Sequence, residues 1–586
     1  MHGCLLRGCT GNMRLVCLVL VVCLAGVGVS VEVDVGVEVV LQQGRLRGNK
    51  EVLEDGRHYY TFLGIPYAQP PIGDLKFKAP VRAGGWKGLR DERVQPEPCL
   101  QPGSSTDNVL YQGSEDCLYL NIFTPNQTFQ SVGEGKGGLA VMVYLHGGSF
   151  IRGSIKDYNP KPLLSQGGVV VVTVQYRLGV YGFLSTEDEV LPGNLGLRDQ
   201  TEALRWVKDN IHKFGGDPNR VTLFGESAGA GSVHLQVLSP HAKGLFQRAI
   251  LQSGTALCPW SIGQSHREMA FKLGRLLNCT TVDNNNNNST QLVACLSKTP
   301  FSDIVLASSN LAEWFIFPVV AVPRVDGDFL PDYPANILAS GFFNHVDMIS
   351  GITRDEGIYS TLSLYTKFKP ELELLSTNFS HTAPLALSLT NEESPEYLAL
   401  LAMLKYLPHL HVIDENDMQG LTQLVTDQSF KSCHWSTVAF QSRTNRKVYQ
   451  YMFEHRGQYS FTQLYNTTLA STHVSHGDDL FYLFDGLLPH ATLTHPEDLF
   501  VRHVITQLWT NFATTGNPTQ YGSLGFRWTP QTPYKWSDQP SSPYLSISTT
   551  PGMKSPTTAE IQNQEFWRRF PTKSNKILFP ELFLEE

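Results

Sequence analysis

Continuous apolar runs that alternate with helical segments constrain the fold of this chain more than any other feature of its sequence. The run GLAVMVYLHGG begins at residue 138, and similar runs cover residues 167–179, 220–227 and 246–254, separated by helical stretches such as LRDQTEALRWVKDNIHKFGG. Strands that are buried on both faces have this continuous apolar character, and helices between them return the chain for the next parallel strand. The sequence therefore predicts an α/β fold, in which a mostly parallel central sheet has helices on both faces.

Two later runs, residues 346–353 and 447–455, predict further strands of the same sheet. Residues 31–136 instead contain short alternating stretches broken by Gly and Pro, which are typical of a small antiparallel sheet. The length of 586 residues by itself favours about three or four domains. The candidate catalytic residues described below must nevertheless meet in one site, and they span residues 147–476. We therefore expect one domain over residues 31–586.

The first 30 residues resemble a secretory signal peptide. From Met13 the chain reads MRLVCLVLVVCLAGVGVS, which combines a basic start, an apolar core and small residues, Gly28 and Ser30, where a peptidase could cut. A signal anchor is the alternative, but the apolar core is short for a bilayer. The terminal FPELFLEE matches neither a lipid-anchor tail nor a retention signal. We expect residues 1–30 to be removed and the protein to be secreted and extracellular, without a membrane anchor.

The charge and the cysteines restrict the partners and the compartment. The formal net charge of −8 argues against nucleic acid as a partner. Four of the ten cysteines lie in the leader, and the six that follow it allow fifteen pairings. Short loop closure in an oxidising compartment favours disulfides between Cys99 and Cys117 and between Cys279 and Cys295. The sequence contains no CxxC motif and no His cluster that would suggest a metal site, and we expect no metal and no cofactor. Sequons that predict N-glycosylation begin at Asn126, Asn278, Asn287, Asn288, Asn378 and Asn466.

The segment VTLFGESAGAGSV, residues 221–233, places Ser227 between a predicted strand and a predicted helix. A sharp turn at this point would hold the serine in a strained conformation with its hydroxyl exposed. Side chains at positions 225 and 229 would collide with the crossing backbone, so glycine suits both. This arrangement is typical of a nucleophile elbow, although a lone G-x-S-x-G also occurs by chance.

A second motif, LHGGSF at residues 145–150, follows another predicted strand. A glycine pair at a strand end allows backbone N–H groups to approach a developing oxyanion without hindrance from side chains. The alternative interpretation is an ordinary tight turn.

Four segments together resemble the type-B carboxylesterase and cholinesterase family: EDCLYLNIFTP (115–125), YLHGGSF (144–150), NLGLRDQ (194–200) and FGESAGAGSV (224–233). The resemblance extends from about residue 33 to residue 570. It implies a single α/β-hydrolase domain with a deep gorge and hydrolysis of small-molecule esters by a Ser, Glu and His triad.

The resemblance assigns the triad residue by residue. The nucleophile matches Ser227, and GITRDEG (351–357) resembles the stretch in which the acid precedes a glycine, which nominates Glu356. Pattern alone would leave Asp355 as a close rival. HVSHGDDLFYLF (473–484) resembles the family's His-Gly segment, which makes His476 the base and leaves His473 outside the site.

The same matching implies an oxyanion hole made by the backbone N–H groups of Gly148, Ser149 and Ala228. The family usually has a third successive glycine where this chain has Ser149, and a backbone donor survives that change if the side chain points away. In cholinesterases a choline-binding tryptophan lies where this chain has Asp107, so we expect poor selectivity for choline esters.

Further residues receive supporting roles from the resemblance. Glu226 matches a buried glutamate beside the nucleophile, and Ser253 matches a serine near the acid. Trp260 matches an acyl-pocket tryptophan, although a plain core aromatic is an equal alternative. Cys433 matches a cysteine whose usual partner is replaced here, so Cys258 and Cys433 are either free and buried or bonded to each other.

The resemblance therefore predicts a secreted serine carboxylesterase that hydrolyses uncharged esters through an acyl-enzyme. Hydrolysis of a juvenile-hormone-like terpenoid methyl ester is the main alternative within this class. A non-catalytic adhesion or binding protein on the same scaffold is the alternative from another class, because fold alone does not prove function. Such relatives usually lack the nucleophile, which this chain retains.

Overall fold

The computed structural model describes residues 36–103, 109–125, 137–279, 288–319, 321–407, 413–522, 524–533 and 542–584. The predicted leader over residues 1–30, Asp107 and the sequon asparagines Asn126 and Asn287 lie outside these residues.

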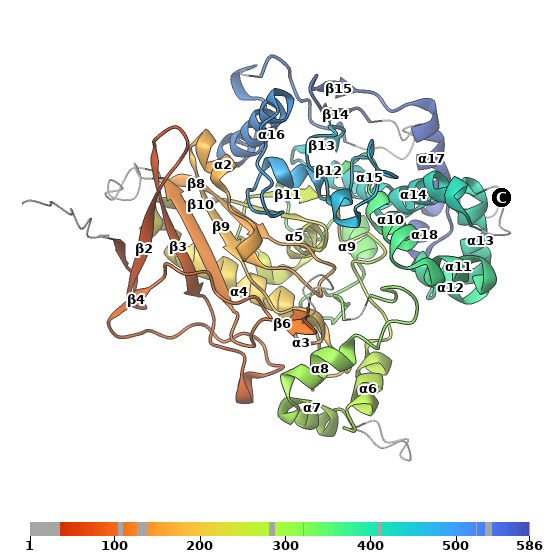
Figure 1. Ribbon diagram of the computed structural model, residues 1–586, viewed down its shortest axis with the longest axis horizontal. Helices are drawn as coiled ribbons and strands as arrows, with labels where there is room; N and C mark the ends of the chain where they lie inside the picture. Colours follow the sequence, from red (N-terminus) through yellow and green to blue (C-terminus); the bar gives the residue numbers. More distant parts are fainter. Residues whose placement is uncertain are drawn as a thin grey trace, which may run out of the picture.

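The central feature is a sheet of 13 strands that runs through the molecule (Figure 1). Its order is β1-β2-β3-β7-β9-β8-β10-β11-β12-β13-β14-β15, with β4 paired to β2, and β5 and β6 form a separate pair. The strands are β1 (Val37–Val40), β2 (Arg45–Val52), β3 (His58–Pro66), β4 (Leu89–Asp91), β5 (Gln101–Pro102), β6 (Tyr111–Gln112), β7 (Tyr119–Pro125), β8 (Leu139–Leu145), β9 (Val169–Val174), β10 (Gly216–Glu226), β11 (Arg248–Gln252), β12 (Asp347–Thr353), β13 (Val448–Phe453), β14 (Tyr544–Ile547) and β15 (Gly552–Lys554).

The predicted parallel sheet is confirmed. The six apolar runs form strands β8 to β13, and neighbouring strands from β9 through β8 and β10 to β14 pair in parallel. At the N-terminal end, β1, β2, β3 and β7 pair antiparallel and join the main sheet at β9. The antiparallel strands therefore extend one edge of the central sheet.

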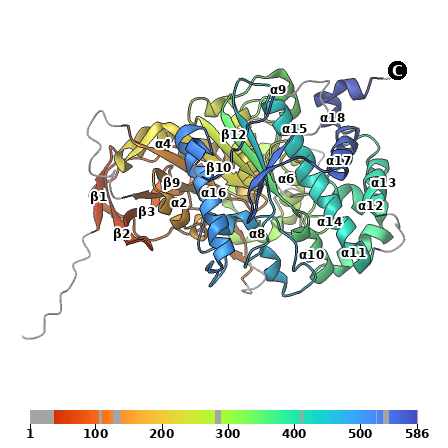
Figure 2. The same ribbon diagram turned by 90° about the horizontal axis from the view of Figure 1, so that it is seen from above.

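Helices cover both faces of the sheet (Figures 1 and 2). They are α2 (Lys161–Gln166), α3 (Gly179–Phe183), α4 (Leu195–Asn210), α5 (Ala228–Leu238), α6 (His266–Leu276), α7 (Ser289–Lys298), α8 (Phe301–Ser308), α9 (Pro334–Ser340), α10 (Ile358–Thr366), α11 (Lys369–Thr377), α12 (Phe379–Ala386), α13 (Pro395–Tyr406), α14 (Met418–Thr426), α15 (Ser432–Gln441), α16 (Pro496–Thr515), α17 (Thr558–Arg568) and α18 (Lys573–Leu578). Within the described part of the chain, none of these helices is both long and apolar enough to cross a membrane.

The alternation of side chains along β8 shows how both faces are used. Val141 and Val143 belong to a hydrophobic cluster that includes residues of α4 and α5, whereas Met142 and Tyr144 belong to a cluster that includes residues of α2 and α16. Successive side chains of a strand point to opposite faces, so a strand covered on both sides must be apolar throughout. This is the physical reason why the strands read as unbroken apolar runs.

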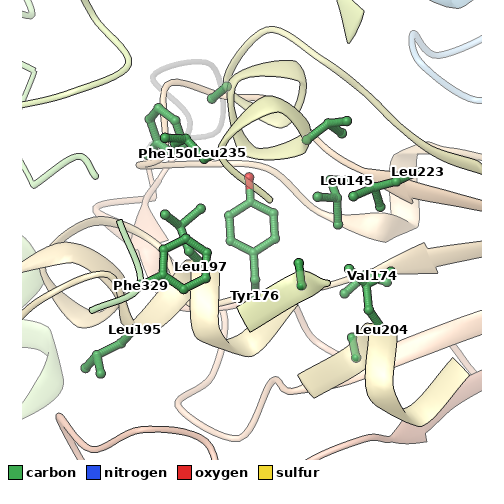
Figure 3. Close-up of a cluster of buried hydrophobic side chains, with 14 of the residues drawn as sticks. Leu145, Phe150, Val174, Tyr176, Leu195, Leu197, Leu204, Leu223, Leu235 and Phe329 are labelled. Carbon is green, nitrogen blue, oxygen red and sulfur yellow. The ribbon is translucent and has the colours of Figure 1, made fainter. Parts of the chain in front are cut away.

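One cluster of buried apolar side chains packs around Tyr176, which contacts the segment between β8 and the glycine pair. Tyr176, just past β9, lies among buried side chains that include Leu197 and Leu235 (Figure 3). Its hydroxyl donates to His146 O at 2.7 Å, and its ring stacks on the His146 ring with 4.6 Å between centroids. This contact fixes the backbone at the end of β8, directly before the glycine pair.

Three disulfides join the six cysteines of the described chain: Cys99–Cys117, Cys279–Cys295 and Cys258–Cys433. The sequence left Cys258 and Cys433 either free or bonded to each other, and in the structure they form a disulfide. The sequon asparagines that the structure describes, Asn278, Asn288, Asn378 and Asn466, are all exposed.

Candidate active site

Ser227 occupies the turn between β10 and α5, and its backbone has φ 57° and ψ −126°. Non-glycine residues rarely adopt a positive φ, and such strain persists only where the surroundings impose it. A Cβ at Gly225 would lie 2.6 Å from the carbonyl carbon of Gly229, and a Cβ at Gly229 would lie 2.1 Å from Leu145 O. Both glycines are therefore required by the close crossing of β8, β10 and α5.

The backbone before α5 is held from the neighbouring strand as well. Ser227 N donates to Gln252 O at 2.8 Å, and Gly231 N donates to Ser227 O at 2.9 Å. Among the described residues, the Ser227 hydroxyl itself has no hydrogen-bond partner. The turn thus fixes the main chain and leaves Oγ available.

His476 is brought against Glu356 from a distant part of the chain. Its Nδ1 lies 2.6 Å from Glu356 Oε2, and Thr353 N donates to the other carboxylate oxygen of Glu356 at 2.7 Å. Glu356 is fully buried in side chain, and 16% of the His476 side chain is exposed. The contact at Nδ1 leaves Nε2 of the same ring as the second nitrogen that can donate or accept a proton.

The rival residues do not take part in this contact. Asp355 accepts a hydrogen bond from Val474 N at 2.9 Å and pairs with Arg354 at 2.8 Å. His473 lies with its Nε2 3.1 Å from Gln419 Oε1. The structure thus joins Glu356 to His476 and directs Asp355 and His473 elsewhere.

Glu226 adds a second carboxylate to the histidine. Its Oε1 lies 3.1 Å from His476 Nε2, yet this oxygen accepts no hydrogen bond of acceptable geometry from the described residues. Burial raises the pKa of the Glu226 carboxyl above its usual value. For His476, burial opposes the charged ring, but the Glu226 and Glu356 carboxylates outweigh it and raise the pKa of the imidazole.

The glycine loop after β8 lies beside the turn that carries Ser227. A Cβ at Gly147 would lie 3.0 Å from Ser227 Cβ. Gly148 has φ 109°, and a Cβ there would lie 2.1 Å from Arg152 O, so no side chain fits. Ser149 follows with φ 55°, a left-handed conformation that glycine would adopt at lower cost.

Three backbone donors remain free at this loop and at the start of α5. The N–H groups of Gly148, Ser149 and Ala228 donate no hydrogen bond to any described residue. Unpaired N–H groups at a helix start and in a glycine loop suit a developing negative charge.

The remaining predicted residues surround this centre. Ser253 has φ 57°, and its buried hydroxyl has no hydrogen-bond partner in the described chain. Trp260 is half-buried and donates from Nε1 to Ser429 O at 2.9 Å. Its ring edge reaches Gly254, where an added Cβ would lie 2.8 Å from Trp260 Cη2 and 2.6 Å from Ser227 O. The indole therefore lies close to the turn that carries Ser227.

Two residues beside the histidine were missed by the sequence reasoning. The Phe430 ring lies 4.8 Å from the His476 ring and 5.9 Å from the Trp260 ring, measured between centroids. Phe430 belongs to a π-helix, Asp427–Lys431, whose extra residue per turn has no signature in composition. Asp479 is fully buried and accepts from Gln252 Nε2 at 2.8 Å and from Tyr451 OH at 3.0 Å.

The arrangement suits covalent catalysis by side chains. It contains a strained serine, a histidine oriented by a buried carboxylate and unpaired N–H donors. In the described part of the chain, no group of three His, Cys, Asp or Glu residues is placed to hold a metal ion.

Comparisons with known proteins identify the family. The sequence pattern of the carboxylesterase family matches residues 36–567. The chain is 35% identical to juvenile hormone esterase of Tribolium castaneum over 510 residues, which cover 83% of this chain and 85% of the relative. It is 32% identical to venom carboxylesterase-6 of Apis mellifera, with 91% and 94% covered, and 34% identical to esterase FE4 of Myzus persicae, with 82% and 85% covered. Because the match spans most of both chains, the protein belongs to the carboxylesterase family and is a carboxylic ester hydrolase.

Proposed function

We propose that this protein is a secreted serine carboxylesterase in which Ser227 is the nucleophile, His476 is the general base and Glu356 orients the imidazole. The observation that carries the proposal is the 2.6 Å contact between His476 Nδ1 and the buried Glu356, next to a serine in a strained turn. A hydrogen bond to Nδ1 fixes the tautomer, so that Nε2 is the nitrogen that accepts a proton.

In the proposed reaction, Nε2 of His476 removes the proton from Ser227 as Oγ attacks the ester carbonyl carbon. The N–H groups of Gly148, Ser149 and Ala228 donate to the oxyanion of the tetrahedral intermediate. The protonated His476 then donates its proton to the leaving alcohol, and the acyl group remains on Ser227. A water molecule, deprotonated by His476, attacks the acyl-enzyme and releases the carboxylic acid.

Two carboxylates stabilise the imidazolium that forms in both steps. Glu356 contacts Nδ1, and Glu226 lies 3.1 Å from Nε2. An opposite charge at this distance favours the protonated ring, which is the state that exists in each transition state. Glu226 therefore acts as a supporting residue beside the base, and Ser253 receives a supporting role from the family resemblance alone.

The substrate side of the proposal is an uncharged ester with an apolar acyl group. Trp260 and Phe430 place aromatic surface beside His476 and the nucleophile turn. The position that supplies the choline-binding tryptophan in cholinesterases is Asp107 here. A terpenoid methyl ester remains the alternative substrate, since one relative is named juvenile hormone esterase.

Secretion and domain limits are part of the same proposal. The apolar leader over residues 1–30, the three disulfides and the exposed sequon asparagines support export through an oxidising compartment. One domain over residues 31–586 agrees with the family match over residues 36–567.

Covalent labelling tests the proposal directly. An organophosphate should modify Ser227 alone and abolish ester hydrolysis, because the activated hydroxyl attacks phosphorus as it attacks a carbonyl carbon. Ser227→Ala should lower kcat by about 10⁴-fold or more. A label on another residue in the peptide map, or an alanine variant that keeps its activity, would remove Ser227 from the mechanism.

A further inference from the structure

A cavity of about 300 Å³ lies next to the candidate active site, and neither Ser227, Glu356 nor His476 lines it. Its walls are formed by the chain from Ala256 to Met269, by α9, α15, α17 and α18, and by β13 and β14. Figures 1 and 2 both place these helices together on one side of the molecule. The volume is in the range of about 300–1,000 Å³ that is typical of small-molecule sites.

The cavity is lined in part by Trp260, the residue that the family resemblance matches to an acyl-pocket tryptophan. Cys258, Cys433 and Trp260 all line it, and the two cysteines are buried and bonded to each other. Trp260 therefore contacts both the cavity and, through Gly254, the turn that carries Ser227. The lining also includes the exposed residues Tyr333 and Asn391, so the cavity reaches the protein surface.

His266 is the polar group that this cavity leaves unsatisfied. It is 2% exposed and lines the cavity. Its ring lies against the Gly263 backbone, which raises the pKa slightly, but neither ring nitrogen makes a hydrogen bond of good geometry with a described residue. Burial, assisted by the charge of Arg324, lowers the pKa of the imidazole to about 4, so the ring is neutral at pH 7. A neutral imidazole offers one N–H donor and one acceptor nitrogen.

The other buried polar side chains of the wall form hydrogen bonds within the protein. Gln428 Nε2 donates to Leu387 O, and Gln450 Nε2 donates to Ser542 O. Arg568 pairs with Glu565 at 2.8 Å. Among the lining residues, His266 alone has buried polar side-chain atoms that lack a partner in the described chain.

We propose that this cavity is a second ligand site, separate from the catalytic centre, for an uncharged apolar molecule that carries one hydroxyl, aryl amine or carbonyl group. The hydrocarbon part packs against walls such as Met269, Val322 and Phe579, and the polar group bonds to His266. A carboxylate is disfavoured, because burying an unpaired charge is costly and His266 supplies no compensating cation. A medium-chain alcohol fits both the size and the chemistry.

The binding experiment uses the full-length enzyme after complete organophosphate modification, confirmed by mass, so that the catalytic centre is blocked. The uncharged fluorophore N-phenyl-1-naphthylamine should bind saturably to one site. At pH 7.5, 1-octanol should displace it, and octanoate of the same chain length should need at least a tenfold higher concentration. The proposal fails if the blocked enzyme shows no saturable binding, or if octanoate displaces the probe as well as the alcohol does.

Variants of α15 test the location of the ligand site. Ser436 lines the cavity from α15, so Ser436→Trp should weaken probe binding at least 20-fold, whereas Ser436→Ala should change it less than twofold. Ala439→Leu on the same helix is a milder filling variant, for use if the tryptophan impairs folding. Hydrolysis of a small acetate ester by the unmodified variants should stay within twofold of the parent, which shows that the fold and the catalytic centre are intact.

His266→Phe tests the polar contact. It should weaken displacement by 1-octanol about tenfold and leave displacement by 1-chlorooctane within twofold, because only the alcohol can bond to the imidazole. Equal effects on both competitors would remove His266 from the site. Probe binding that survives both Ser436→Trp and Ala439→Leu would place the ligand elsewhere and overturn the proposal.

Discussion

Gly229→Ala gives the sharpest test of how the backbone sets the reacting geometry. The added Cβ would lie 2.1 Å from Leu145 O and 2.8 Å from His146 O, whereas ordinary contacts begin at 3.4 Å. The backbone must therefore separate by about 1.3 Å. Leu145 ends β8, immediately before the loop that contains Gly148, and residue 229 follows Ser227 by two positions. The displacement therefore falls between the proposed nucleophile and the proposed oxyanion donors.

A misplacement of about 1 Å costs roughly 10²-fold in rate when reacting groups must be aligned. We therefore expect kcat to fall about 100-fold in Gly229→Ala, with a loss of about 1–3 kcal/mol in the free energy of unfolding from overpacking. Hydrolysis of 4-nitrophenyl butyrate gives the rate, titration with an organophosphate counts the competent sites, and thermal unfolding reports the stability.

Gly231→Ala is the matched control, because it lies in the same helix α5. Its Cβ would lie 3.1 Å from Ser261 Oγ, 3.5 Å from Trp260 and 3.6 Å from Phe150, all side-chain atoms that can adjust. Alanine also suits a helix interior better than glycine by about 1 kcal/mol. We expect kcat within about threefold of the parent. If both variants behave alike, or if Gly229→Ala keeps its rate, the spacing of β8 and α5 does not control the chemistry.

Three further predictions concern the base, the acid and the substrate. Glu226→Gln should shift the acidic limb of the kcat/KM profile to lower pH, because His476 must be neutral to accept a proton and the Glu226 carboxylate raises the pKa of its imidazole. An unchanged pH profile would show that Glu226 does not affect the pKa of His476. Glu356→Gln should lower kcat about 10³-fold to 10⁴-fold, whereas kcat of Asp355→Asn should stay within about tenfold of the parent, since of these two acids only Glu356 bonds to the His476 ring. The reverse ranking in steady-state kinetics would assign the role of the acid to Asp355. Uncharged butyrate esters should give a higher kcat/KM than butyrylthiocholine, because the family resemblance puts Asp107 in place of the tryptophan whose ring face would hold the ammonium, an interaction worth about 0.5–2 kcal/mol. A preference for the choline ester would point to another aromatic residue in that role.

The strands were the most predictable part of the molecule. Burial on both faces imposes apolar side chains at every position, so β8 to β13 coincide with the runs in the sequence. The position of Ser227 could also be predicted from the sequence, because a tight strand-to-helix turn restricts positions 225 and 229 to glycine. In both cases a local steric or solvation requirement leaves a direct mark on composition.

The residues that accompany Ser227 in the candidate site were harder to predict from the sequence. Asp355 and Glu356 are adjacent acids, and only the resemblance to a family favoured Glu356; their different partners depend on Val474 and His476, more than 100 positions away. Phe430 reaches His476 through a π-helix, and no local pattern separates it from the other 30 phenylalanines. The cavity around His266 is formed by segments that meet only in the folded chain.

The Cys258–Cys433 bond has a consequence for proteolysis. It spans 175 positions and encloses Glu356, while Ser227 precedes the loop and His476 follows it. A protease that cuts one exposed bond between residues 259 and 432 produces two fragments, one with Ser227 and one with His476, that remain covalently joined by the disulfide. Such a nicked enzyme migrates as one band without reductant and as two bands with it, and its two halves can separate only after both unfolding and reduction.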